Sequence, residues 1–127
     1  MKVLIIINDA PYGTEKAWNA LRIAMQFQRD IEGTEVRISL MSDGVFCSVS
    51  NETTPNGFYN IERMIEAVIH KGGKVRLCTT CGEARGLKAM KLIEGTEWSG
   101  MKELTEWIAD SDKLLGYKNK RYIRPVI

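Results

Sequence analysis

The sequence has little of what marks a secreted, membrane-spanning or nucleic-acid-binding protein. Its three cysteines are an odd and sparse set for a disulfide scaffold, which favours a reducing compartment. The apolar run at residues 3–7 is much shorter than a membrane span and too short for the apolar core of a signal peptide. A net charge of +2 is too small to predict a nucleic-acid partner. We therefore expect a cytoplasmic protein that neither crosses a membrane nor binds nucleic acid.

Motifs for nucleotide cofactors are also lacking. No G-x-G-x-x-G follows the first apolar run, and the sequence contains no P-loop. Histidine occurs once, at position 70, so few side chains are available to complete a metal site. We therefore predict neither a cofactor nor a metal.

What is present is an alternation of apolar strands and amphipathic helices. The length of 127 residues is near the usual size of one domain, and no linker divides it. Strands are expected at 3–7, 36–40, 74–77, 97–98 and 113–117, and helices from about 14, at 61–69, 81–91 and 101–109. This order predicts one α/β domain over residues 1–127, with a mostly parallel five-stranded sheet covered on both faces.

Polar or reactive residues follow three of the predicted strands. Asp9 comes after the first strand, Asp43 after the second, and Cys78 ends the third. Ligands of parallel sheets collect at the carboxyl ends of the strands. The loop at 46–57 is long for a compact domain, and such loops often border sites. We therefore expect the functional site at this edge of the sheet.

The turn that begins at Cys78 is the most informative segment. Thr80 and Glu83 have the spacing of a capping box, which predicts Thr80 as the N-cap of a helix and Cys81 as its first residue. Cys78 would then lie beside unpaired backbone N–H groups, which stabilise an anion. Such a position lowers the pKa of a cysteine thiol. We therefore predict that Cys78 is a reactive thiolate, stabilised by the backbone N–H groups between Thr80 and Gly82.

Three other interpretations of these cysteines remain open at this point. A cysteine that ends a buried strand is often only a small apolar residue. A Cys-x-x-Cys pair at the start of a helix is also typical of redox couples. The third interpretation is half of a zinc site, which Cys47 and His70 would have to complete.

The order of the motifs resembles the DsrE/DsrF-like family. The matching segments are 11–22, 43–45, 54–63, the Cys78-Thr79-Thr80-Cys81 turn with 84–87, 101–107 and 110–115. They span almost the whole chain and keep their order, which is far more specific than the cysteine pair alone. The resemblance implies a three-layer, flavodoxin-like α/β fold that assembles into homo-trimers or hexamers.

TusD-like sulfurtransferases of this family carry sulfur as a persulfide on one cysteine and pass it to a partner protein. Their acceptor cysteine ends a strand ahead of a helix and a glycine, and it matches Cys78, with Gly86 as the glycine. The resemblance therefore implies that Cys78 takes sulfur from a donor protein and yields it to an acceptor protein. Cys81 departs from the TusD pattern and is similar to the second cysteine of DsrE-like proteins with a paired motif. At this position Cys81 would resolve a persulfide on Cys78 into an internal disulfide.

Further residues are expected around this site. Cys47 lies in the loop after the second strand, where similar DsrE-like sequences also place a cysteine. A 2-1-3 strand order would bring that loop and the Cys78 turn to either side of the loop after the first strand. Asp9 and Tyr12 in that first loop would then form a wall of the pocket, with Asp9 as a proton acceptor. The simpler alternatives are a packed loop thiol for Cys47 and a turn residue for Asp9.

A second class of function also remains open, a non-catalytic module that binds a small molecule or assembles with a partner on the same scaffold. Substitution of Cys78 separates the two classes, because a sulfur carrier loses its cargo while a binding module keeps its ligand.

The segment 118–127 carries four positive charges. We expect it to be either a solvated terminus or a segment that docks on a neighbouring subunit.

Overall fold

The computed structural model describes residues 1–117, so the segment 118–127, expected to be either a solvated terminus or a docking segment, lies outside the described residues. Within the described residues, five strands alternate with helices. They are β1 (Lys2–Ile7), α1 (Lys16–Asp30), β2 (Glu35–Leu40), the 3-10 helix η1 (Ser42–Ser48), α2 (Ile61–His70), β3 (Lys74–Cys78), α3 (Thr79–Ala84), the 3-10 helix η2 (Leu87–Ala89), β4 (Thr96–Ser99), α4 (Met101–Asp110) and β5 (Lys113–Tyr117).

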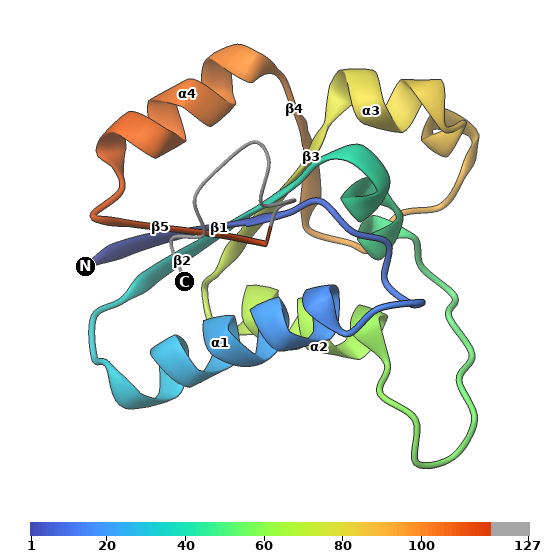
Figure 1. The fold of residues 1–127 in the computed structure, drawn as a ribbon, viewed down its shortest axis with the longest axis horizontal. Helices are drawn as coiled ribbons and strands as arrows, with labels where there is room; N and C mark the ends of the chain where they lie inside the picture. Colours follow the sequence, from blue (N-terminus) through green and yellow to red (C-terminus); the bar gives the residue numbers. More distant parts are fainter. Residues whose placement is uncertain (118–127) are drawn as a thin grey trace.

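The five strands form one sheet in the order β4-β3-β2-β1-β5, and every neighbouring pair is parallel. Helices α1 and α2 cover one face of this sheet and α4 covers the other (Figure 1). The predicted three-layer α/β sandwich with a mostly parallel five-stranded sheet is therefore confirmed.

The predicted 2-1-3 strand order is wrong. β3 pairs with β2 and not with β1, with Ile38 opposite Val75 and Leu40 opposite Leu77. The connections through α1 and through α2 each step to the adjacent position in the same direction, as consecutive elements most often do. The turn after β3 therefore lies beside the end of β2, one strand away from the end of β1.

β1 is buried on both faces, as its continuous apolar run predicted. Its odd-numbered side chains pack into a large core with α1 and α2, and its even-numbered side chains pack into a second, smaller core under α4. The smaller core consists of Leu4, Ile6, Leu104 and Trp107. Each such side chain contributes about 1.5–3 kcal/mol through burial, so β1 holds the two layers of helices together.

The start of α1 and the loop after β2 differ from the sequence prediction. α1 begins at Lys16 with Glu15 as its N-cap, whereas Thr14 lies ahead of the helix and its hydroxyl accepts the backbone N–H of Lys16 at 3.3 Å. The start of the predicted loop at 46–57 belongs to η1, which packs against the ends of β2 and β3.

Within residues 1–117, no helix is both long and apolar enough to span a lipid bilayer.

Candidate functional site

Helix α3 begins directly at the end of β3, earlier than the sequence predicted. Cys78 is the N-cap residue in an extended conformation, and its Sγ accepts the backbone N–H of Cys81 at 3.5 Å. Thr80 therefore lies inside the helix and not at its N-cap, so the capping-box prediction is wrong. The physical reason is that Cys78 itself serves as the cap, its sulfur accepting the N3 backbone N–H of Cys81, so the helix starts at Thr79, two residues earlier than predicted.

Helix α3 is also shorter than the predicted helix at 81–91. It ends at Ala84, and Gly86 then adopts a left-handed conformation with φ of 78°. A non-glycine residue is disfavoured there, which explains why the chain leaves the helix at this point. The rest of the predicted helix is the short η2 turn.

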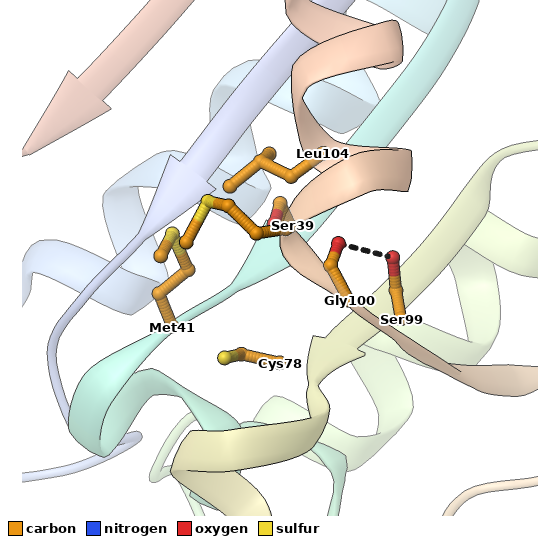
Figure 2. A pocket seen from close by; sticks show the side chains of 7 residues that line it. Ser39, Met41, Cys78, Ser99, Gly100 and Leu104 are labelled. Atoms are coloured by element: carbon orange, nitrogen blue, oxygen red, sulfur yellow. Dashed lines mark hydrogen bonds between the residues drawn. The ribbon is translucent and has the colours of Figure 1, made fainter.

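Cys78 lines a small pocket between the carboxyl edge of the sheet and the start of α4 (Figure 2). Its side chain extends from the end of β3 towards Met41 (Figure 2). The other lining residues are Ser39, Met41, Ser99, Gly100, Met101 and Leu104. The pocket has a volume of about 10 Å³, near the smallest that holds one water molecule. It therefore has room for about one further atom beside the sulfur of Cys78.

The strand order produces this pocket. Because β3 lies between β2 and β4, the ends of all three strands meet, and they contribute Ser39, Cys78 and Ser99. The hydroxyl of Thr79 donates to the backbone carbonyl of Ser99 at 3.1 Å, which ties the start of α3 to the end of β4. Apart from Cys78, the sequence analysis missed these residues. Serine and methionine at strand ends carry no chemical signature until the strand order is known.

The electrostatic surroundings of Cys78 differ from those expected. Partial burial is the largest effect and raises the pKa of the Cys78 thiol, and the neighbouring Cys81 thiol raises it further. The backbone N–H groups of Cys81 and Thr80 lower the pKa, but they do not outweigh burial. The predicted low pKa is therefore wrong, because desolvation at the strand end outweighs the two backbone N–H groups that favour the anion.

We expect the rate at which iodoacetamide modifies Cys78 to keep rising with pH above about 8.5, the ordinary cysteine pKa. Only the thiolate reacts, and burial moves its formation to higher pH. The variant Cys81→Ala removes one group that raises the pKa and is expected to shift the profile to lower pH. Peptide mapping by mass spectrometry, which separates Cys78 from the other cysteines, measures both profiles. A rate that levels off near neutral pH in the wild type would contradict this electrostatic description.

Contacts on both sides hold α3 in place. Arg85 Nε donates to Asp43 Oδ1 at 2.9 Å, and another guanidinium nitrogen of Arg85 donates to the carbonyl of Cys81 at 3.1 Å. Gly82 is buried, and a Cβ at this position would lie 2.5 Å from the ring of Trp98. Asp43 and Arg85 thus clamp the helix to η1, and Gly82 allows it to pack closely on β4.

The structure places Cys47 away from this pocket. Its side chain is fully buried in the large core, and its Sγ donates to the backbone carbonyl of Asp9 at 3.7 Å. Burial, together with the charge of Asp9, raises the pKa of Cys47 to about 12. The carboxylate of Asp9 lies 3.8 Å from the ammonium group of Lys16. Neither Cys47 nor Asp9 lines the Cys78 pocket, so the structure does not bring them together with Cys78.

Tyr12 belongs to an aromatic cluster next to α1 and α2. Its hydroxyl accepts the backbone N–H of Ile61 at 3.1 Å and donates to the carbonyl of Tyr59 at 3.4 Å. The ring of Tyr59 stacks on that of Trp18, with 5.1 Å between the centroids, and on that of Phe58, with 4.7 Å. Tyr12 therefore fixes the loop before α2 and does not line the Cys78 pocket.

The residues proposed for a zinc site are dispersed in the structure. His70 ends α2, Cys47 lies in the core, and Cys78 and Cys81 lie at the start of α3. In the part of the chain that the structure describes, no three His, Cys, Asp or Glu side chains form a group that would hold a metal ion.

The comparison with protein families decides the classification. The model of the DsrE/DsrF-like family matches residues 1–117, almost the whole chain. The chain belongs to the DsrE/DsrF-like family. Membership in this family supports a role related to sulfur relay.

Several relatives in the DsrE/DsrF-like family are similar over most of their length. Protein YchN of Escherichia coli K12 is 35% identical over 116 residues, which cover 91% of this chain and 98% of YchN. The uncharacterized protein MJ0989 of Methanocaldococcus jannaschii is 37% identical over 117 residues, 92% of this chain and 100% of that protein.

Solved structures agree with this membership. The crystal structure of YchN from E. coli superimposes with a TM-score of 0.87 at 35% identity and covers 92% of this chain and 99% of that chain. The structure of MTH1491, a protein of unknown function from Methanobacterium thermoautotrophicum, gives a TM-score of 0.74 at 14% identity, with 91% of this chain and 98% of that chain covered. The second likeness concerns the fold alone.

Proposed function

We propose that this protein is a sulfur carrier that holds a persulfide on Cys78 and relays its outer sulfur from a donor protein to an acceptor protein. The observation that carries the proposal is the pocket beside Cys78, whose volume of about 10 Å³ fits one additional atom. Membership in the DsrE/DsrF-like family supports the same chemistry.

Loading is a thiol exchange at sulfur. The Cys78 thiolate attacks the outer sulfur of a donor persulfide, and the bond between that sulfur and the donor's own sulfur breaks. The electron pair leaves with the donor as a thiolate, which takes up the proton that Cys78 released. Delivery is the same exchange, with the acceptor thiolate attacking the outer sulfur now held on Cys78.

The surroundings of Cys78 suit a resting thiol that reacts when its donor is docked. The raised pKa keeps the thiol protonated at neutral pH, which lowers its reactivity towards adventitious electrophiles. The backbone N–H groups of Cys81 and Thr80 then stabilise the sulfur anion once it forms. The side chains of Met41 and Leu104 line the pocket and separate the outer sulfur from solvent thiols.

The same proposal includes a homo-oligomer, a trimer or a hexamer, in the cytoplasm, where reducing conditions keep the thiols free. Sedimentation or light scattering of the purified full-length chain measures the assembly. A monomer at micromolar concentration would contradict this part of the proposal and leave the chemistry of Cys78 untouched.

Intact-mass spectrometry after incubation with glutathione persulfide tests the carrier function. We expect the chain to gain the mass of one sulfur atom, to lose it on addition of a reductant, and to deliver it to a small acceptor thiol. The variant Cys81→Ser is included because it keeps the backbone donor to Cys78 while removing the second thiol. If neither protein gains sulfur, the relay is excluded, and the non-catalytic binding module becomes the function to pursue.

A further inference from the structure

We propose that Cys81 gives this protein a second activity, the release of hydrogen sulfide from its own persulfide. In this step the Cys81 thiolate attacks the inner sulfur, Cys78 Sγ, and not the outer sulfur. The products are a Cys78–Cys81 disulfide and sulfide. This inference rests on the proposed loading of Cys78.

The two cysteines are already in contact across the first turn of α3. Cys78 is the N-cap, Cys81 is three residues further on, and the backbone N–H of Cys81 lies 3.5 Å from Cys78 Sγ. The Cys81 thiol also interacts directly with that of Cys78, since it raises the pKa of Cys78. Residues three apart on a helix have Cβ atoms about 5–6 Å apart, so a small movement of the N-cap reaches the separation of about 3.5–4.5 Å found in disulfides.

The second cysteine lies outside the pocket. Cys78 lines the pocket towards α4, and Cys81 does not. Cys81 packs against the large core, which Cys78 also touches. An outer sulfur held in the pocket therefore lies in a space that Cys81 does not line, whereas Cys78 Sγ is in contact with Cys81.

This arrangement favours attack on the inner sulfur. Thiol exchange depends on which sulfur atom the attacking thiolate can reach. The choice of sulfur determines the product. Because Cys81 contacts Cys78 Sγ and does not line the pocket, the inner sulfur is the one within its reach. Transfer of the outer sulfur onto Cys81 would require it to leave the pocket first.

The step balances without an added oxidant. A bond forms between the sulfur atoms of Cys81 and Cys78, and the bond between Cys78 Sγ and the outer sulfur breaks. The electron pair leaves with the outer sulfur, which departs as hydrosulfide, and the Cys81 thiol gives up its proton to solvent. The outer sulfur is reduced to sulfide while the two thiols are oxidised to a disulfide, and a dithiol reductant returns the protein to its starting state.

Release therefore competes with delivery. A docked acceptor attacks the outer sulfur and leaves Cys78 as a free thiol, whereas Cys81 attacks the inner sulfur and leaves a disulfide. Cys81 thus limits the time for which an undelivered persulfide persists, and it turns a stalled carrier into an oxidised protein that is closed to loading until it is reduced.

Decay of the persulfide after removal of excess donor tests this inference. The full chain is loaded with glutathione persulfide, desalted without reductant, and followed by intact mass and by trapping of free sulfide with bimane. The wild type is expected to lose the added sulfur, to lose two further hydrogens relative to the reduced protein, and to release one sulfide per chain. In Cys81→Ser the persulfide is expected to last at least about tenfold longer, because an intramolecular thiol acts at a high effective concentration.

Two further variants keep the result interpretable. Glu83→Gln, an exposed change on the same helix, is expected to decay like the wild type, and Cys81→Ala replaces Cys81→Ser if circular dichroism shows the serine variant to be unfolded. Equal persulfide lifetimes in the wild type and both Cys81 variants, or sulfur mapped onto Cys81, would overturn the release activity and leave the carrier intact. Absence of loading in every variant would instead overturn the carrier itself.

Discussion

Replacing Cys78 with serine is expected to reduce sulfur loading by more than about a hundredfold, because a serine hydroxyl without a catalytic base is a far weaker nucleophile than a thiolate. The fold is expected to survive the change. Cys78 is half-buried and serves as the N-cap of α3, and serine is among the best N-cap residues. Intact mass after incubation with glutathione persulfide measures the loading, and thermal unfolding measures the stability.

Cys47→Ala is the matched control for this experiment. Cys47 is fully buried with a pKa of about 12, so its removal costs some core packing but takes away no accessible thiolate. We expect this variant to load sulfur as the wild type does. Undiminished loading in Cys78→Ser, with the sulfur mapped to Cys47 or Cys81, would refute the assignment of the carrier cysteine.

Replacing Gly44 with alanine is expected to lower the free energy of unfolding by about 3 kcal/mol, the upper end of the usual cost of overpacking. Gly44 is buried in η1, and a Cβ there would overlap the backbone carbonyl of Ile7. That carbonyl accepts the backbone N–H of Met41 at 2.9 Å, and Met41 lines the Cys78 pocket. A backbone group cannot rotate aside as a flexible side chain does, so the ends of β1 and η1 must separate.

Gly100→Ala is the matched control for Gly44→Ala. At Gly100 a Cβ would meet only the carboxylate of Glu103, at 3.4 Å, and the backbone φ of −96° suits any residue. The expected cost is less than about 1 kcal/mol, typical of alanine at a helix N-cap. Urea denaturation of both variants measures the two free energies. A Gly44→Ala protein as stable as the control would show that η1 moves away from β1 without cost.

The regular elements could be predicted from the sequence because their signals are local. Each signal is visible within a few residues: β1 is a continuous apolar run, β2 alternates apolar and polar residues, and α2 has an amphipathic stripe. The start of α3 could not be located in the same way. Two residues, Cys78 and Thr80, are both possible N-caps, and in the structure the sulfur of Cys78 caps the helix by accepting the backbone N–H of Cys81.

The sequence by itself determined the α/β class, the parallel sheet and the position of Cys78 at the end of a buried strand, because these follow from hydrophobic period and chain order. Only the tertiary structure decided which residues surround Cys78. Placing β3 between β2 and β4 brought Met41 and Ser99 to it and left Asp9 and Cys47 elsewhere. It also decided that the pKa of Cys78 is raised, because desolvation depends on atoms from strands far apart in sequence, whereas the helix start that favours the anion is local.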